Sequence, residues 1–225
     1  MMLKQSFLKI LKLYKILLFF TGTMLVQLNA SAQWTGEIEA YKYIGTGAEG
    51  SFQPLAHIST SNNWYGEIRY NYEDARTFSL YAGKTFSGGK VVEYSITPMA
   101  GYSTGAFTGL SLAVNTEAEW KAFYFSSQSQ YSISTKTKED NFLFSWSELG
   151  YSITDNFFTG FTAQYTRTIC QTYLEPGIVM GVRFKNVEIP FYVFKPFRRE
   201  RYFVLGLSYE FNLGKKTKGL PLLNK

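Results

Sequence analysis

The sequence contains few of the residue types that most often carry chemistry. Its 225 residues include one histidine, His57, and one cysteine, Cys170. A single cysteine excludes an internal disulfide. Zinc sites usually combine several histidine, cysteine or carboxylate ligands, and this chain offers only one histidine and one cysteine for that purpose. We therefore expect no metal centre and no bound cofactor.

Long apolar runs are also missing once the first 32 residues are set aside. Those residues carry four lysines, then the apolar stretch Ile16–Leu28, then the small residues Ala30–Ala32. This order predicts a signal peptide for export by the Sec route, cleaved before Gln33. An uncleaved anchor is the alternative, but about 13 apolar residues interrupted by Gly22 fall short of the ~20 that span a bilayer.

Strong charge of one sign is absent from the body of the chain. The formal net charge is +6, but the leader holds four lysines and the segment 214–225 holds four more, so removing both segments takes it to −2. Nucleic-acid binding needs basic residues clustered on one face, which this distribution does not provide. We expect a signal peptide at 1–32, one domain at 33–213 and a short basic tail at 214–225.

Aromatic residues are plentiful, and apolar side chains recur with a period of two. In the segment 201–211, every second residue is apolar, and the residues between are small, polar or ambiguous: Phe203, Leu205, Leu207, Tyr209 and Phe211 form the apolar row. A period of two predicts a strand with one apolar face. About ten similar segments precede it, and a closed barrel in lipid, apolar outside and polar inside, accounts for them better than a soluble sandwich.

The ending Tyr209-Glu210-Phe211 resembles the aromatic terminal strand of Gram-negative outer-membrane β-barrel proteins. The resemblance implies an all-β fold, a transmembrane antiparallel up-and-down β-barrel. It also implies residence in the cell outer membrane as an integral multi-pass protein, with the lipid bilayer and the barrel-assembly machinery as partners.

Segments rich in Gly, Asn and Asp divide the domain into about twelve strands, with ten as the alternative. An even number places both termini in the periplasm. Strands are expected at 107–115, 118–133 and 141–153, of which the last two fit either phase. We expect bulges near Glu148 and Pro98. Connections of about two to four residues, except Ser134–Asp140, disfavour a receptor or an adhesin.

The alternation sends ten ionisable side chains into the lumen, which we expect them to line: Glu37, Glu39, His57, Glu67, Arg69, Glu93, Glu175, Arg183, Glu188 and Glu210. Carboxylates outnumber guanidinium groups, so the interior is acidic. Twelve strands give a backbone diameter of roughly 24 Å and a bore of roughly 10 Å or less, which Tyr41, Tyr65 and Tyr192 could fill. A narrow, cation-preferring pore and a filled, rigid core are both consistent with this interior.

One short motif, His57-Ile58-Ser59, raises a different function. Outer-membrane phospholipases place a histidine and a serine two residues apart on one strand, so His57 and Ser59 are candidate catalytic residues of a phospholipase- or deacylase-like enzyme that modifies lipid. Against this, the phase of Ala56 and Ile58 turns both side chains inward, away from a lipid substrate. We therefore expect a non-enzymatic barrel, either a narrow channel or a structural or accessory component of the membrane, with the lipid-modifying enzyme as the alternative.

Overall fold

The structure is a computed structural model that describes residues 34–45 and 52–213. The predicted signal peptide and basic tail lie outside the described residues. Within them, no helix has the length and hydropathy that crossing a bilayer requires. The described elements are β1 (Trp34–Ile44), β2 (Phe52–Thr60), β3 (Trp64–Tyr70), β4 (Thr77–Lys84), β5 (Phe86–Gly88), β6 (Glu93–Gly105), β7 (Gly109–Trp120), β8 (Phe123–Ser134), the 3-10 turn η1 (Lys138–Asp140), β9 (Phe142–Ser152), β10 (Phe157–Thr168), β11 (Thr172–Phe184), β12 (Val187–Phe194) and β13 (Tyr202–Leu213).

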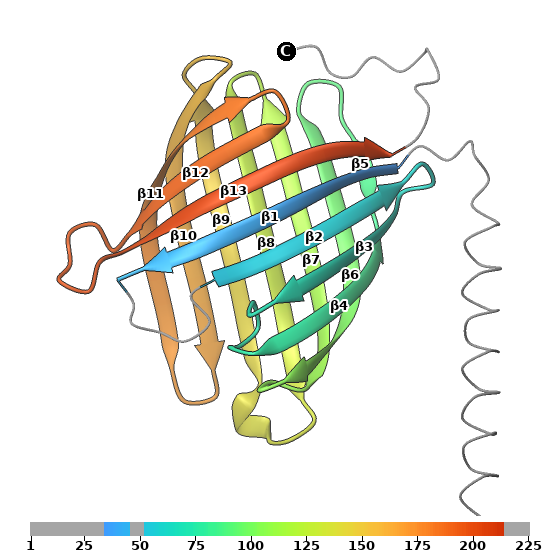
Figure 1. Ribbon diagram of the computed structural model, residues 1–225, viewed down its shortest axis with the longest axis vertical. Helices are drawn as coiled ribbons and strands as arrows, with labels where there is room; N and C mark the ends of the chain where they lie inside the picture. Colours follow the sequence, from blue (N-terminus) through green and yellow to red (C-terminus); the bar gives the residue numbers. More distant parts are fainter. Residues whose placement is uncertain (1–33, 46–51, 214–225) are drawn as a thin grey trace, which may run out of the picture. The chain divides into compact units, whose positions relative to one another are not determined.

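The strands form one antiparallel sheet that closes on itself (Figure 1). Sequence neighbours pair with each other, and β1 also pairs with β13 along its whole length. The short β5 continues β4, because both pair with β6 in one register: Gly83 faces Met99 and Phe86 faces Ile96. Counting β4 and β5 as one interrupted strand gives a barrel of twelve, which confirms twelve strands over ten.

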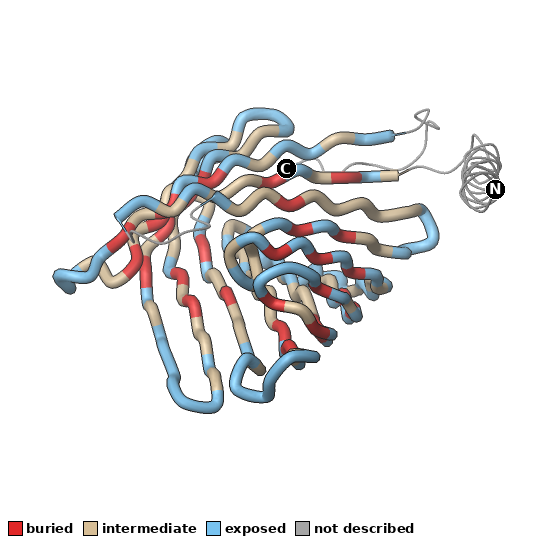
Figure 2. The backbone as a smooth tube through the Cα atoms, turned by 60° about the horizontal axis from the view of Figure 1, so that its bottom comes forward, coloured by how far each residue is buried: buried red, intermediate tan, exposed pale blue. Residues whose placement is uncertain are grey.

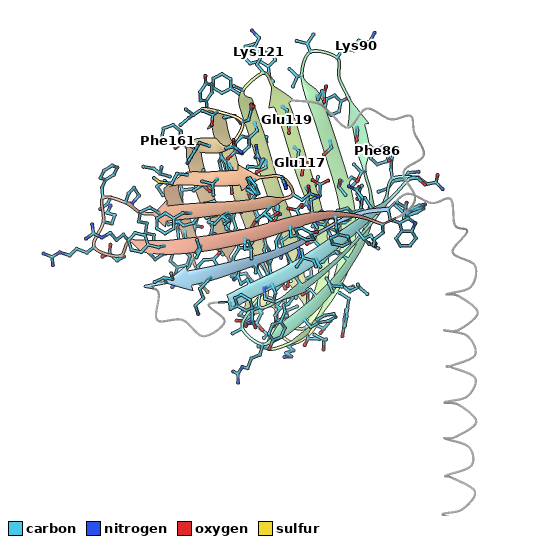
Figure 3. All side chains as sticks on the ribbon, turned by 45° about the horizontal axis from the view of Figure 1, so that its top comes forward. Phe86, Lys90, Glu117, Glu119, Lys121 and Phe161 are labelled. Carbon is cyan, nitrogen blue, oxygen red and sulfur yellow. The ribbon has the colours of Figure 1, made fainter. Side chains whose placement is uncertain are left out.

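Side chains alternate between the interior and the exterior along each strand, as a period of two requires (Figure 2). The exterior is apolar: Leu112 is 68 % exposed and Phe161 is 72 % exposed, and Figure 3 shows Phe161 on the outer side of the wall. An exterior with so many exposed apolar side chains is unfavourable in water and favourable in hydrocarbon.

Exposed aromatic side chains gather near both ends of the wall. At the end where Trp34 and Leu213 lie, they include Trp64, Trp120, Phe157 and Phe184; at the opposite end they include Phe52, Tyr70, Phe78 and Tyr131. Aromatic rings concentrate at the two interfaces of a membrane, where one edge contacts lipid and the other contacts water. The two groups therefore mark the borders of the lipid-facing band.

The connections differ in length between the two ends. At the end that carries the described termini, strands are joined by two to four residues, as expected from the sequence. At the opposite end the connections 71–76, 135–141 and 195–201 have six or seven residues, so the expectation of a single long connection was wrong. Longer loops on one side and short turns on the other are typical of barrels in the bacterial outer membrane.

The register corrects both predicted bulges. Pairing of β9 with β8 runs without a break from Tyr151 to Phe142, so no bulge lies near Glu148. Phe142 and Trp146 occupy inward positions of β9, because the interior beside them is aromatic rather than aqueous. Pairing of β6 with β7 is equally unbroken through Pro98. Pro98 has no backbone N–H to donate. It lies in the gap between the last pair of β6 with β4, which is Met99 with Gly83, and the first pair of β6 with β5, which is Ile96 with Phe86.

One hairpin was also misplaced. The sequence predicts a break near residues 116–117, whereas the structure continues β7 to Trp120 and turns at Lys121-Ala122. Lys121 has a φ of 55°, in the left-handed region that normally favours glycine or asparagine. A lysine there gives no recognisable turn signal, which explains the error.

Candidate functional site

An acidic cavity of about 910 Å³ fills the half of the lumen nearest the described termini. Eight carboxylates line it: Glu37, Glu39, Glu117, Glu119, Glu148, Asp155, Glu188 and Glu210. The lining cations are Lys121 and Arg183, and the guanidinium of Arg183 is already paired with Glu188 at 2.6 Å. Figure 3 labels Glu117 and Glu119 on β7, close to the turn at Lys121. Negative charge therefore dominates this half of the lumen.

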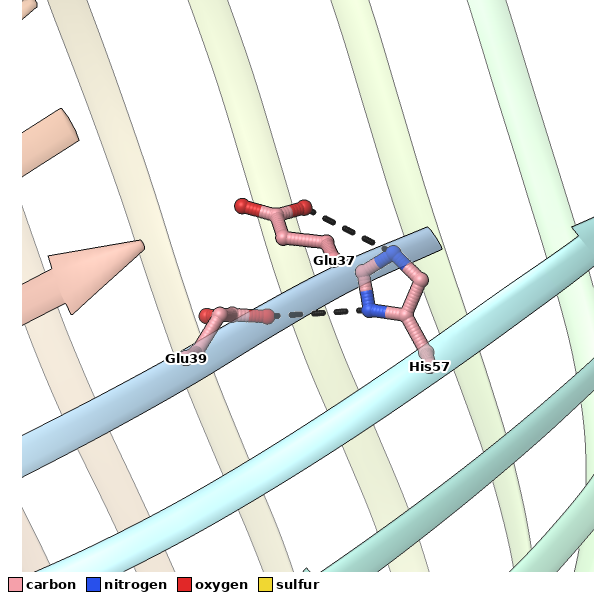
Figure 4. A group of neighbouring side chains, drawn as sticks. All are labelled: Glu37, Glu39 and His57. Carbon is pink, nitrogen blue, oxygen red and sulfur yellow. Dashed lines mark ion pairs between the residues drawn. The ribbon is translucent and has the colours of Figure 1, made fainter. Parts of the chain in front are cut away.

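The three side chains Glu37, Glu39 and His57 meet on the wall of this cavity (Figure 4). The paired strands β1 and β2 place Glu37 directly opposite His57. The imidazole Nε2 lies 3.5 Å from Glu37 and Nδ1 lies 3.7 Å from Glu39. Both separations exceed a normal hydrogen bond, so the ring lies between two carboxylates without a direct hydrogen bond to either. Its face stacks on Tyr65, with ring centroids 5.3 Å apart.

Aromatic rings close the inner end of the cavity. Trp146 lies between Tyr41 and Tyr192, with ring centroids 5.2 Å and 5.1 Å away. Tyr65 lines the same level and donates a hydrogen bond to Glu67. The sequence suggests these three tyrosines as side chains that fill the bore, and the structure places them at the inner end of the cavity.

Beyond this inner end of the cavity, a buried network centred on Arg69 crosses the lumen. The guanidinium donates to Glu67 and, at 2.6 Å, to Gln130 on β8, and it lies 3.5 Å from Glu73. We call Glu67, Arg69, Tyr72, Glu73, Tyr81 and Gln130 the Arg69 network. The rings of Tyr72 and Tyr81 pack against the guanidinium at 4.4 Å and 4.3 Å. Burial raises the pKa of the Tyr72 hydroxyl, which keeps it a neutral donor to Gln128.

An aromatic cluster fills the rest of this half. Tyr202 stacks on Phe194 at 5.1 Å and on Tyr43 at 6.1 Å. Gln164 donates to the Tyr43 hydroxyl at 2.9 Å, and the Tyr202 hydroxyl donates to Glu175 at 3.0 Å. Inward side chains at this level are fully buried on many strands, among them Thr77, Ser79, Ser103, Ser132, Val179 and Val204. The lumen is therefore packed in one half and hollow in the other.

The ten residues predicted to line the lumen all occupy inward positions, but they divide among four environments. Six of them line the acidic cavity: Glu37, Glu39, His57, Arg183, Glu188 and Glu210. Glu67 and Arg69 are buried in the Arg69 network. Glu93 is exposed at the first residue of β6, and Glu175 pairs with Lys195 at 2.5 Å near the opposite end.

Besides Asp155, which lines the cavity from the turn between β9 and β10, four inward carboxylates were missed. Glu117 and Glu119 were not assigned to the lumen because the break predicted near 116–117 ended the strand before them, whereas β7 continues to Trp120. Glu148 was lost because the expected bulge left its direction undefined. Glu73 lies in the connection 71–76 and was taken as a turn residue, yet its side chain is 0 % exposed. An unbroken period of two through each strand would have found the first three.

His57 and Ser59 do not form the pair that a lipid hydrolase requires. Both lie on the inward face of β2, and both imidazole nitrogens face carboxylates. Within the described residues, no hydrogen bond joins the Ser59 hydroxyl to the imidazole. A general base must reach the hydroxyl it activates, and a lipid substrate would lie on the other side of the wall.

Comparison with solved structures finds the same fold. The KdgM porin aligns with a TM-score of 0.55 at 12% identity, covering 78% of this chain and 99% of that one. The NanC porin aligns with a TM-score of 0.52 at 11% identity, covering 77% of this chain and 98% of that one. The chain has the fold of an outer-membrane β-barrel protein. A second KdgM structure, in complex with disordered oligogalacturonate, aligns with a TM-score of 0.53 at 12% identity.

No protein-family model matches this sequence, and no curated protein sequence matches it. The outer-membrane barrel is therefore recognised by its architecture: twelve antiparallel strands, an apolar exterior and two aromatic borders. It is an integral, multi-pass barrel of the outer membrane, with lipid around its wall. At sequence identities of 11% and 12%, the structural likeness establishes the fold alone. The function has to be inferred from the lumen.

Proposed function

We propose that the barrel is a narrow channel that prefers cations, and that the structure represents its closed state. One observation carries the proposal: eight carboxylates and two cations line a cavity that runs into the lumen from the end carrying the described termini. Charged rings set the selectivity of membrane pores. The closed state follows from the Arg69 network and the aromatic cluster, which occupy the other half.

The sign of the charge argues for cations over anions. A related fold has been solved with oligogalacturonate, whose sugar units carry carboxylates. The present cavity would repel such a ligand, because its own lining is acidic. The channel we propose therefore has a barrel fold like that of the KdgM porin but would disfavour the oligoanion with which that porin was solved. We further propose that residues 1–32 direct export and that the barrel-assembly machinery inserts the folded wall.

The test is ion selectivity in planar bilayers. Wild-type protein should show a small conductance with a reversal potential that favours potassium over chloride. Replacing the cavity carboxylates Glu37, Glu117 and Glu119 with glutamine preserves side-chain shape and removes three negative charges. A charge ~7 Å from the ion path attracts potassium and repels chloride by about 0.6 kcal/mol each in water, so each change should lower the permeability ratio about sevenfold.

A matched control is Glu200→Gln, which removes a carboxylate from the exposed connection 195–201 instead of from the cavity. It should leave the permeability ratio unchanged. A folded wild-type barrel without ion conductance would refute the channel and support a structural or accessory role. An anion preference in the wild type would refute the assignment of selectivity to the acidic cavity.

A further inference from the structure

The connection between β12 and β13, residues 195–201, is firmly anchored at its base. Lys195 pairs with Glu175 at 2.5 Å, and its backbone N–H donates to the carbonyl of Pro176 at 2.8 Å. A further bond, from the N–H of Arg198 to the carbonyl of Lys195, closes a turn. Figure 1 shows this loop extending beyond the barrel wall. The residues after the turn are thus presented on a fixed base.

Three arginines in this loop have no protein partner. Arg198, Arg199 and Arg201 are exposed, and none forms an ion pair or a side-chain hydrogen bond with another described residue. By contrast, Arg69 and Arg183 inside the barrel are both paired with carboxylates. Guanidinium groups donate two parallel hydrogen bonds to phosphate, so three such groups within four residues can form a binding site for phosphate anions.

An apolar side chain stands beside these charges. Phe197 is 94 % exposed, which leaves its ring almost without protein contact. In the turn between β10 and β11, at the same end of the barrel, Ile169 is 63 % exposed, and the exposed Arg167 precedes it. Arginine side chains alone are sufficient to bind a soluble anion, and an exposed apolar ring adds nothing to that binding. Cations mixed with unpacked apolar side chains suit a surface in which phosphate groups lie directly above hydrocarbon.

The location of the loop agrees with such a surface. It lies at the end opposite the described termini, where the connections are longest, and this is the extracellular end in bacterial outer-membrane barrels. We infer that the loop 195–201 binds a phosphorylated lipid of the outer leaflet, with Arg198, Arg199 and Arg201 on its phosphate groups and Phe197 among its acyl chains. This interaction is independent of conduction through the lumen.

The experiment measures binding of purified lipopolysaccharide to the full-length barrel in nanodiscs. The triple variant Arg198→Gln, Arg199→Gln, Arg201→Gln should weaken binding about 100-fold, since each basic residue near a charged membrane surface contributes about fivefold. Phe197→Ser should weaken binding of the intact lipid, but not of its deacylated phosphorylated sugar.

The matched control removes three exposed lysines at the opposite end: Lys84→Gln, Lys90→Gln and Lys185→Gln (Lys90 is labelled in Figure 3). It should bind the lipid as the wild type does. Equal loss in both triple variants would overturn the assignment, because general charge would then explain binding. Unchanged binding in the arginine variant would also overturn it, as would inorganic phosphate displacing the lipid at micromolar concentration. Heat-modifiable gel migration confirms that each variant is folded.

Discussion

Replacing Arg69 with alanine should destabilise the barrel more than any other single change in its lumen. The side chain of Arg69 is 1 % exposed, and its partners Glu67 and Glu73 are 2 % and 0 % exposed. Removing the cation would leave two carboxylates buried without compensation. Breaking a buried ion pair by deleting one partner costs about 3–5 kcal/mol, because a desolvated charge remains behind.

A second variant separates lost charge from lost volume. Arg69→Met together with Glu67→Gln and Glu73→Gln removes the cation and both anions while keeping side-chain volume. Replacing a buried ion cluster with neutral groups is often close to neutral in stability, so this variant should recover most of the loss. Urea unfolding in phospholipid vesicles, followed by tryptophan fluorescence, measures both free energies. An alanine variant within about 1 kcal/mol of the wild type would refute the view that Arg69 organises the packed half.

The same pair of variants connects stability with conduction. Arg69 joins β3 to Gln130 on β8, so its loss removes a link across the lumen. Alanine at this position should raise single-channel conductance or the fraction of time spent open, and the neutral triple variant should raise it less because its side chains still fill the space. If the triple variant conducts more than the alanine variant, charge in the network and not its volume closes the lumen.

Three further predictions test the wall, the alternative function and the orientation. Leu205→Arg places a cation on the lipid-facing side of β13 and should cost about 2–4 kcal/mol and block folding into vesicles, whereas Leu205→Ala should still fold. His57→Ala should leave the lipid composition of the outer membrane unaltered in cells; a lipid change that follows this histidine would restore the enzyme hypothesis. Cys170, the single cysteine, is exposed in the turn between β10 and β11, so a membrane-impermeant maleimide should label it on intact cells, and labelling only after permeabilisation would reverse the orientation.

The sequence predicts the exterior of this barrel better than its interior. Outward positions are governed by one simple requirement, contact with hydrocarbon, which Leu205 and Leu207 or Ile178 and Met180 satisfy in plain alternation. Strand number and membrane class therefore follow from a period of two. Inward positions follow no single rule, because the residue type at each one depends on the side chains that it contacts across the lumen.

The segment 141–153 shows why the interior is harder. Phe142, Phe144 and Trp146 look like a lipid-facing row, but they point inward and pack beside Tyr192 and Phe107. Their outward neighbours Ser145 and Ser147 instead form hydroxyl contacts with Ser129 and Ser127 on the next strand. Polarity at these positions is inverted by long-range contacts, so periodicity alone could not fix their phase.

The packed half of the lumen restricts how the channel can open. The wall is closed by hydrogen bonds through every strand pair, so widening it would break backbone bonds along a strand. Tyr72 and Glu73, however, belong to the connection 71–76 and enter the Arg69 network from a loop. Withdrawal of this loop would remove one aromatic ring and one carboxylate from the guanidinium without disturbing any strand. Opening by movement of the loop is therefore less costly than opening by expansion of the barrel.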